Sequence, residues 1–358
     1  MQICRHMAHE FSVPSLPPTI SPTPLFDLFR GNYATGLLVA AVAEFGVFSA
    51  LAGDPLDFNQ LKVATRLQDR PLTVLLTALR AMNTLTRELD QRYTLTPLAR
   101  EHLLPGGDYF IGDYFGLARD SADIRELIIR FRTNRPKGAD EAGAGTGFIF
   151  RDGLKSAMEE TAAARQFTLA LAGRAKNAAP VLAHVLRLPT ATRLVDVGGG
   201  TGLYSIALLR ANPQLRAVVW DRPEVLRVAA EFAAESGVAD RLELVPGDFF
   251  KDPFPTGADV VLLSNILHDW DIPEARQLVH RCGAALPVGG KLLVHDVFLD
   301  GDLGGPLPAA LYSANLFAVT EGRLYSAAEV KAWAAEVAVV MTRLVPTLIQ
   351  AQVYEGVK

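Results

Sequence analysis

Residues 194–202, LVDVGGGTG, decide the fold of this chain. The segment LVDV is apolar and mostly β-branched apart from Asp196, which is typical of a short buried strand. The glycines at 198–200 follow it, and the next segment, LYSIALLRAN, has apolar residues at helical spacing. A strand, a glycine turn and a helix form the first half of a nucleotide-binding α/β unit, because glycines allow a tight turn and let a ligand approach the backbone.

The glycine turn narrows the class of ligand. A dinucleotide fingerprint requires G-x-G-x-x-G, and here Gly198 and Gly200 fit while Leu203 occupies the third glycine position. Asp196, just before the glycines, would repel a phosphate and suits a cationic ligand. S-adenosylmethionine carries an ammonium and a sulfonium and no phosphate. The turn therefore favours this cofactor, although any doubly wound domain can contain a glycine turn.

Two further acidic residues follow the next two predicted strands. Residues 217–225, AVVWDRPEV, predict a strand ending at Asp221, where a carboxylate can bind ribose hydroxyls. Residues 242–250, LELVPGDFF, predict a third strand ending at Asp248 and Phe249. The carboxylate can accept a hydrogen bond from an adenine amino group, and the phenyl ring can cover the face of the adenine. Each acid alone could be a turn residue or a helix cap, but acids at three successive strand ends predict one S-adenosylmethionine site.

Composition and charge limit the other partners. The 358 residues allow two or three domains, and a net charge of −4 gives no electrostatic basis for binding nucleic acid or an anionic membrane. Cys4 and Cys282 form no disulfide framework, so we expect a cytoplasmic protein in a reducing interior. The N-terminus lacks a signal-peptide pattern, and the longest apolar stretch, residues 36–52, is too short to cross a bilayer. We expect no membrane partner and assign no metal site.

Residues 25–51 have a helical pattern that is apolar on several sides, with the segments LFDLF and GLLVAAVAEFGVFSAL. A helix that is apolar all round needs more partners than a small domain offers, so we expect a homodimer interface here. The preceding residues 1–24, rich in Pro, Ser and Thr, predict a flexible tail.

Residues 57–104 have the pattern of a winged helix, with helices at 58–67 and 71–85 and then a short hairpin. Such a module can bind DNA when its second helix presents basic residues to a groove. In the segment 72–85, Arg80 is the only basic residue. We therefore expect a structural or dimerising role rather than nucleic-acid binding.

The candidates for substrate contact are scattered along the chain. Phe148 and Met158 follow a glycine-rich stretch in a region that predicts helical connectors. They could line a pocket, although Met and aromatic residues at such spacing more often belong to a core. Asn315 and Phe317 are further candidates, and together the four predict only that the substrate is flat, apolar and hydroxylated.

The residues with a candidate chemical role follow a fourth predicted strand at 260–263. The segment 264–270 leaves the carboxyl end of this strand, where ligands bind in open α/β sheets. We assign Ser264 to the cofactor site, Asp269 to the substrate site and His268 to catalysis, although a lone histidine is more often structural.

A fifth predicted strand, within residues 290–300, carries Asp296 near its carboxyl end. Adjacent strand ends would bring Asp296 within reach of His268, where a carboxylate fixes the imidazole tautomer. Methyl transfer to a phenol needs such a base, because forming the phenolate at pH 7 costs about 4 kcal/mol when the phenol ionises near pH 10. A neutral histidine takes this proton as the oxygen attacks the methyl group.

The chain resembles the S-adenosylmethionine-dependent O-methyltransferases of the caffeic acid O-methyltransferase type, which have many bacterial members acting on aromatic small molecules. The resemblance covers nearly the whole chain from about residue 25, and its most specific motifs are DVGGGTG, GDFF, LHDW and EGRLYSAAE. It implies cofactor contacts at the glycine turn, Asp221, Asp248 and Phe249, a base at His268, and a homodimer formed through the N-terminal helices and winged-helix region.

The chain also departs from the plant members of this family. Plant enzymes flank the histidine with two acidic residues; Asp296 matches the first, and Leu324 stands at the second. Ser264 occupies a position where lysine is frequent, and Arg222 replaces a commoner leucine. Some relatives with this fold catalyse hydroxylation or decarboxylation. A reaction other than methyl transfer is therefore an alternative for this chain. A winged-helix regulator that senses S-adenosylmethionine is a second alternative.

These observations predict an α/β protein of defined organisation. A Rossmann-like methyltransferase domain that binds S-adenosylmethionine is expected at 186–358, and a helical and winged-helix-like dimerisation domain at 25–105. A flexible tail at 1–24 precedes them, and a helical connector at 106–185 contributes to the substrate pocket. The predicted reaction moves a methyl group from S-adenosylmethionine to a hydroxyl of an aromatic small molecule.

Overall fold

The computed structural model describes residues 11–136 and 161–358, and the chain divides into two compact units. We call the first the sheet unit; its described residues are 11–24, 161–298 and 327–358. We call the second the helical unit; its described residues are 25–136 and 299–326. Both units are therefore assembled from segments that are separate in the sequence.

A seven-stranded sheet forms the centre of the sheet unit, in the order β5-β4-β3-β6-β7-β9-β8. The first five strands in this order are parallel, and β9 runs antiparallel to both β7 and β8. The predicted α/β class and its five parallel strands are confirmed. The strands are β3 (Arg193–Val197), β4 (Arg216–Asp221), β5 (Leu242–Pro246), β6 (Val260–Ser264), β7 (Lys291–Val297), β8 (Val340–Pro346) and β9 (Ala351–Val357).

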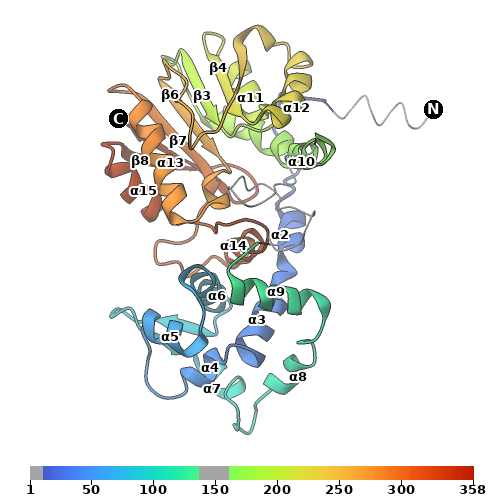
Figure 1. Cartoon of the computed structure of the whole chain (residues 1–358), viewed down its shortest axis with the longest axis vertical. Coiled ribbons are helices and arrows are strands. Elements are labelled where there is room, and N and C mark those ends of the chain that lie inside the picture. Colours follow the sequence, from blue (N-terminus) through green and yellow to red (C-terminus); the bar gives the residue numbers. More distant parts are fainter. Residues whose placement is uncertain (1–10, 137–160) are drawn as a thin grey trace, which may run out of the picture. The chain divides into compact units, whose positions relative to one another are not determined.

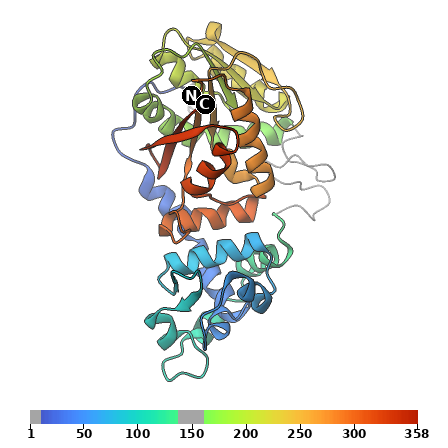
Figure 2. The same ribbon diagram turned by 90° about the vertical axis from the view of Figure 1, so that its left-hand side faces the viewer.

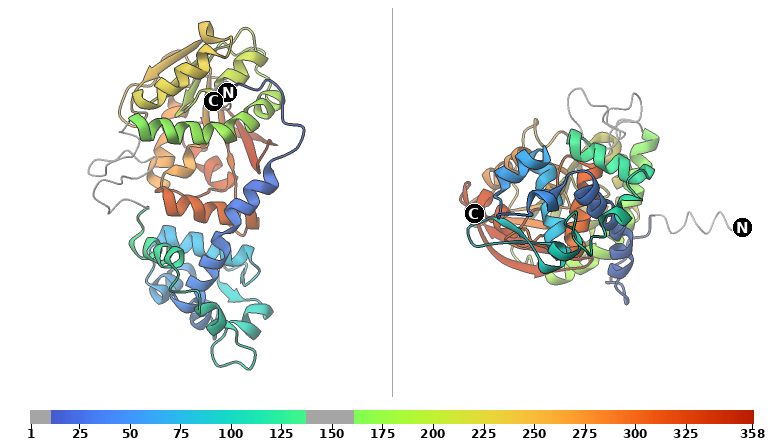
Figure 3. Two further views of the ribbon diagram at one scale, coloured as in Figure 1. Left: turned by 90° about the vertical axis from the view of Figure 1, so that its right-hand side faces the viewer. Right: turned by 90° about the horizontal axis from the view of Figure 1, so that it is seen from below.

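Helices cover both faces of this sheet (Figure 1). Helices α13 and α15 lie on the face turned to the viewer in Figure 2, and α10, α11 and α12 lie on the opposite face, seen in the left view of Figure 3. Because neither face of the central strands meets water, a strand such as β6 is buried at every position. The helices are α10 (Thr161–Val185), α11 (Leu203–Ala211), α12 (Pro223–Ala234), α13 (Ile272–Ala285) and α15 (Ala327–Ala335).

The strand register brings the polar strand ends to one edge of the sheet. Asp221, the last residue of β4, pairs with Pro246 at the end of β5. Ser264, the last residue of β6, pairs with His295 of β7. Loops that leave the carboxyl ends of β3, β4, β5, β6 and β7 therefore meet at this edge, which is where open α/β sheets bind ligands.

The helical unit contains the predicted winged helix, formed by α5, α6 and the hairpin of β1 and β2. Helix α14, from a distant part of the sequence, packs along α6 in the same unit. The elements are α2 (Thr23–Gly31), α3 (Tyr33–Ala43), α4 (Val47–Ala50), α5 (Phe58–Thr65), α6 (Asp69–Ala81), β1 (Leu85–Arg87), β2 (Tyr93–Leu95), α7 (Pro97–His102), α8 (Gly112–Gly116), α9 (Ala122–Thr133) and α14 (Leu307–Val319).

The apolar stretch 25–51 is divided among α2, α3 and α4 and is not one helix. One break falls before α4 at Gly46, whose φ of 57° is left-handed and suits glycine. The apolar residues of α3 belong to the core of the helical unit, which accounts for a helix that is apolar on several sides. On α2, in contrast, Leu25, Leu28 and Phe29 are 70–77% exposed.

The basic residues of α6 are engaged inside the helical unit. Arg70 is buried, donates to the carbonyl oxygens of Thr320 and Gly322, and stacks on the ring of Phe317. Arg80 forms an ion pair with Asp302. Neither side chain is displayed as a groove-binding helix would need. Among the helices of the described residues, none combines the length and apolar character that crossing a membrane requires.

Candidate cofactor and catalytic site

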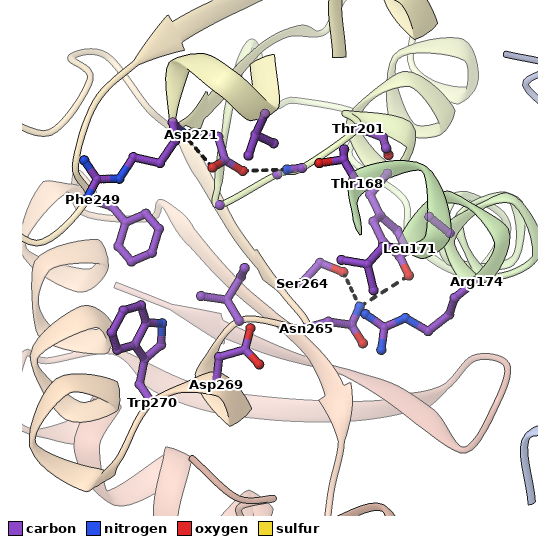
Figure 4. A pocket seen from close by; sticks show the side chains of 18 of the residues that line it. Thr168, Leu171, Arg174, Thr201, Asp221, Phe249, Ser264, Asn265, Asp269 and Trp270 are labelled. Atoms are coloured by element: carbon purple, nitrogen blue, oxygen red, sulfur yellow. Dashed lines mark hydrogen bonds between the residues drawn. The ribbon is translucent and has the colours of Figure 1, made fainter. Parts of the chain in front are cut away.

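A cavity of about 140 Å³ lies at the carboxyl ends of β3, β4, β5 and β6 in the sheet unit (Figure 4). The glycine turn and the loops after these strands line it on one side, and α10 lines it on the other. Its polar lining includes Thr168, Arg174, Tyr204, Asp221, Arg222, Asp248, Ser264, Asn265 and Asp269.

The glycine turn forms one wall, and its glycines are needed for two reasons. Gly198 and Gly200 have φ angles of 67° and 58°, in the left-handed region that side chains disfavour. A Cβ on Gly198 would also lie 2.6 Å from Ile266, whereas Gly200 has no atom within 4 Å of that position. The turn therefore offers open backbone to a ligand, as the sequence predicted.

Asp221 is held at the cavity by two backbone N–H groups. Its Oδ2 accepts the N–H of Gly200 at 2.8 Å and its Oδ1 accepts the N–H of Arg222 at 2.7 Å. Burial raises the pKa of this carboxyl to about 6, so it is mostly ionised at pH 7. Each carboxylate oxygen has a further lone pair, so the group can accept two hydroxyl donors from a ligand.

Asp248 and Phe249 lie together in the turn that follows β5, and both line the cavity. Asp248 accepts the N–H of Phe250 at 2.9 Å and pairs with Arg222 at 3.2 Å. The ring of Phe249 meets Trp270 edge to face, with 6.1 Å between ring centroids. A carboxylate and an aromatic face are thus adjacent, as the sequence predicted.

Asp196 lies beneath the glycine turn and is not among the residues that line the cavity. It is fully buried, its Oδ2 accepts from the Ser205 hydroxyl at 2.7 Å, and a Cβ on Gly199 would lie 2.7 Å from its Cγ. Its Oδ1 is buried and has no hydrogen-bond partner among the described residues. Burial raises the pKa of this carboxyl to about 7, despite the hydrogen bond from Ser205.

His268 and Asp296 form the predicted pair. His268 lies on the short turn Leu267–Asp269 after β6 and is 3% exposed, and its Nδ1 is 2.6 Å from Asp296 Oδ1. A carboxylate only accepts, so Nδ1 carries a proton, and in the neutral ring Nε2 presents a lone pair. Nε2 lies 3.7 Å from Asp269, whose pKa burial raises to about 6. His268 is not itself a lining residue of the cavity, but Asp269 is.

The other predicted site residues are distributed as follows. Ser264 lines the cavity, as does Asp269. Phe148 and Met158 lie outside the described residues. Asn315 and Phe317 lie on α14 in the helical unit; Asn315 donates to the Tyr33 hydroxyl at 3.2 Å, and Phe317 is fully buried against Phe131 and Arg70.

Several lining residues were not predicted from the sequence. Arg174 and Thr168 come from α10, whose pattern carried no sign of a ligand. Asn265 and Trp270 belong to the same segment as His268, so their position after a buried strand was the available signal. Leu324 is buried in the helical unit, and Asp269 is the second carboxylate beside the His268 ring.

Comparison with known proteins identifies relatives along most of the chain. Residues 144–338 match the O-methyltransferase domain family. A 3-hydroxy-5-methyl-1-naphthoate 3-O-methyltransferase of Streptomyces sahachiroi is 36% identical over 88% of this chain and 89% of that protein. The tetracenomycin polyketide synthesis 8-O-methyltransferase of Streptomyces glaucescens is 30% identical over 87% and 89%.

A solved structure is similar over nearly the whole chain. The crystal structure of an O-methyltransferase family 2 protein from Planctomyces limnophilus, in complex with apigenin, superposes with a TM-score of 0.86. The two sequences are 42% identical, and the match covers 97% of this chain and 99% of the other.

Ionisation of Asp196 should destabilise the ligand-free protein. The folded state holds this proton more tightly than the unfolded state, because the pKa is raised from 3.8 to about 7; its contribution to stability is therefore present at low pH and is lost as the pH rises through this interval. The difference corresponds to roughly 4 kcal/mol in the limit of pH 8. Asp196→Asn should remove this loss, measured as urea unfolding at pH 5 and pH 8.

The matched control is Asp240→Asn, which changes an exposed carboxyl of the same unit. It should leave the pH dependence of the wild type unchanged. An Asp196→Asn protein that loses as much stability between the two pH values as the wild type would contradict the assignment.

Proposed function

This chain belongs to the S-adenosylmethionine-dependent O-methyltransferase family, and we propose that it methylates a hydroxyl group of an aromatic small molecule with His268 as the general base. The observation that carries the proposal is the His268–Asp296 pair, which lies beside a cavity lined by carboxylates at the ends of parallel strands. The relative from Streptomyces sahachiroi acts on a hydroxynaphthoate, and the Planctomyces protein holds apigenin, so hydroxylated aromatic rings support the substrate class.

The cavity has the chemistry that the cofactor requires. S-adenosylmethionine supplies, when bound, an electrophilic methyl group on a sulfonium. We assign its ribose hydroxyls to Asp221, which has acceptor capacity on both oxygens, and its adenine to Asp248 and Phe249. Gly198 and Gly200 would let it approach the backbone. Carboxylates and arginines both line the cavity, which suits a ligand that carries cationic groups and a carboxylate.

The His268–Asp296 pair can perform the proton transfer. Asp296 holds the imidazole in the tautomer whose Nε2 accepts a proton, and its charge stabilises the imidazolium that forms. Asp269 at 3.7 Å from Nε2 adds a second negative charge beside the imidazolium and is a candidate contact for the acceptor. Removing the proton as the oxygen reacts avoids the cost of forming free phenolate, about 4 kcal/mol at pH 7 for a phenol that ionises near pH 10.

We also propose that the protein is a homodimer formed through the N-terminal helices. Leu25, Leu28 and Phe29 of α2 are 70–77% exposed, and three large apolar side chains within two helical turns form a continuous apolar face. A second copy of the chain would cover this face.

Binding of S-adenosylhomocysteine should depend on Asp221. Asp221→Ala removes a charged acceptor, and we expect affinity to weaken by about 1.5–3 kcal/mol, measured by isothermal titration calorimetry. Asp240→Ala, which removes an exposed carboxyl of the same charge, should change affinity little. A folded wild-type protein that binds neither S-adenosylmethionine nor S-adenosylhomocysteine would refute the assigned site.

Turnover should depend on His268 far more than cofactor affinity does. His268→Ala should lower the rate of methyl transfer to a phenol panel by roughly 10²–10⁴-fold while leaving the affinity for S-adenosylhomocysteine nearly unchanged. Asp296→Asn should lower the rate of methyl transfer less than His268→Ala does. Raising the pH toward 9 should partly restore the rate of the His268→Ala variant, because the phenol begins to ionise without a base. His280→Ala, at a half-buried histidine of α13 that pairs with Glu336 and does not line the cavity, is the control. Wild-type turnover by His268→Ala at pH 7 would make His268 a structural residue.

The oligomeric state tests the role of α2. In sedimentation velocity at micromolar concentration, the wild type should have twice the chain mass of 38.7 kDa, and the double variant Leu28→Glu, Phe29→Glu should have the mass of one chain. Val288→Glu, at a 95% exposed valine of the sheet unit, should stay dimeric. A stable wild-type monomer at this concentration would exclude the dimer.

A further inference from the structure

We propose that His295, a positioning residue outside the cavity, sets the direction of a chain of hydrogen bonds that ends at Asn265. This direction makes the Asn265 side-chain oxygen the acceptor for the α-ammonium group of S-adenosylmethionine. The inference rests on the proposed binding of the cofactor in this cavity, and it assigns the methionine end of the ligand to particular atoms.

A continuous series of side chains connects β7 and the β8–β9 turn to the cavity. His295 is fully buried, with Nε2 2.9 Å from the Thr347 hydroxyl and Nδ1 2.9 Å from the Ser264 hydroxyl. The Ser264 oxygen is 3.1 Å from Asn265 Nδ2, a contact that Figure 4 shows. Asn265 Nδ2 is also 3.3 Å from the Tyr204 hydroxyl. His295 and Thr347 are not lining residues, whereas Ser264, Asn265 and Tyr204 are.

The direction of each hydrogen bond follows from the number of protons available. Thr347 donates its single hydroxyl proton to the carbonyl oxygen of Ala351 at 2.9 Å, so it accepts from His295 Nε2–H. Burial lowers the pKa of His295 to about 4, so the ring is neutral at pH 7 and has one N–H. Nδ1 is therefore an acceptor, and the Ser264 hydroxyl donates to it.

The amide of Asn265 is oriented by the same sequence of bonds. Because the Ser264 proton is directed at His295, the Ser264 oxygen accepts from Asn265 Nδ2, and the second amide N–H is directed at Tyr204. The backbone of Asn265 is held as well, with a left-handed φ of 58° and its N–H bonded to the His295 carbonyl oxygen at 2.8 Å. Its Oδ1 is then the one atom of this side chain that can accept from a ligand.

The order of the strands decides which end of the ligand Asn265 meets. The sheet order β5-β4-β3-β6 separates the loop after β5, which carries Phe249, from the loop after β6, which carries Asn265. With adenine at Phe249 and ribose at Asp221, the methionine end falls on the β6 side, where Figure 4 also shows Arg174. An α-ammonium needs acceptors and an α-carboxylate needs a cation, and Asn265 Oδ1 and Arg174 meet these needs.

Two ligands that differ in the amino-acid end test the inference. S-adenosylhomocysteine contains this end, and 5′-methylthioadenosine lacks it. We expect His295→Leu to weaken the binding of S-adenosylhomocysteine about tenfold, measured by titration calorimetry at pH 7.5, as when one hydrogen bond to a charged group is lost. The affinity for 5′-methylthioadenosine should change less than about twofold. His295→Asn keeps an acceptor near the position of Nδ1, so it should restore S-adenosylhomocysteine binding to within about threefold of wild type.

A second variant acts at the cavity end of the same series. Ser264→Ala removes the link to Asn265 without touching the core beneath, and it should reproduce the ligand-selective loss even if His295→Leu folds poorly. The double variant should bind S-adenosylhomocysteine no more weakly than either single variant, because both substitutions interrupt the same series of hydrogen bonds. Equal weakening of both ligands, or additive losses, would overturn the inference. Failure of the wild type to bind either ligand would instead overturn the proposed cofactor site.

Discussion

Carboxylates buried at the ends of parallel strands are the constraint on which the site depends. Asp196 and Asp221 stand on neighbouring strands of the sheet, and burial raises the pKa of each well above the ordinary value. Backbone N–H groups and the Ser205 hydroxyl offset part of the cost of this burial, but one oxygen of Asp196 has no partner among the described residues. Burial makes both carboxylates costly to ionise, and a cationic group bound nearby would offset that cost.

Two buried histidines at neighbouring strand ends are given opposite properties by their surroundings. His268 faces the carboxylate of Asp296, whereas His295 lies between the hydroxyls of Ser264 and Thr347. Successive residues of a strand point to opposite faces, so the dipeptide His295–Asp296 of β7 can serve both arrangements at once. On one face of the strand, Asp296 orients the ring that we propose as the base, and on the other His295 is hydrogen-bonded to two hydroxyl groups.

The sequence was most informative where a residue type has few physical roles. Consecutive glycines after an apolar run, and acids at strand ends, predicted the turn and the positions of Asp221 and Asp248. His268 and Asp296 could be paired from strand order alone. Arg174 and Asn265 were missed because a polar residue on a helix or in a loop has many ordinary explanations. Periodicity also could not show that residues 25–51 break into three helices, since the break at Gly46 depends on a local backbone angle.

The path of the chain between the two units has a consequence for its synthesis. Leu311, Ala314 and Phe317 of α14 belong to the core of the helical unit, although most of that unit precedes residue 137. The ribosome therefore makes the first helices long before the segment that completes their core, and it makes the strands β3 to β7 in between. During that interval the apolar residues that α14 covers lack part of their partners, and exposed apolar surface of this kind favours aggregation. The core of the helical unit is therefore complete only once a helix from the last third of the chain has been made.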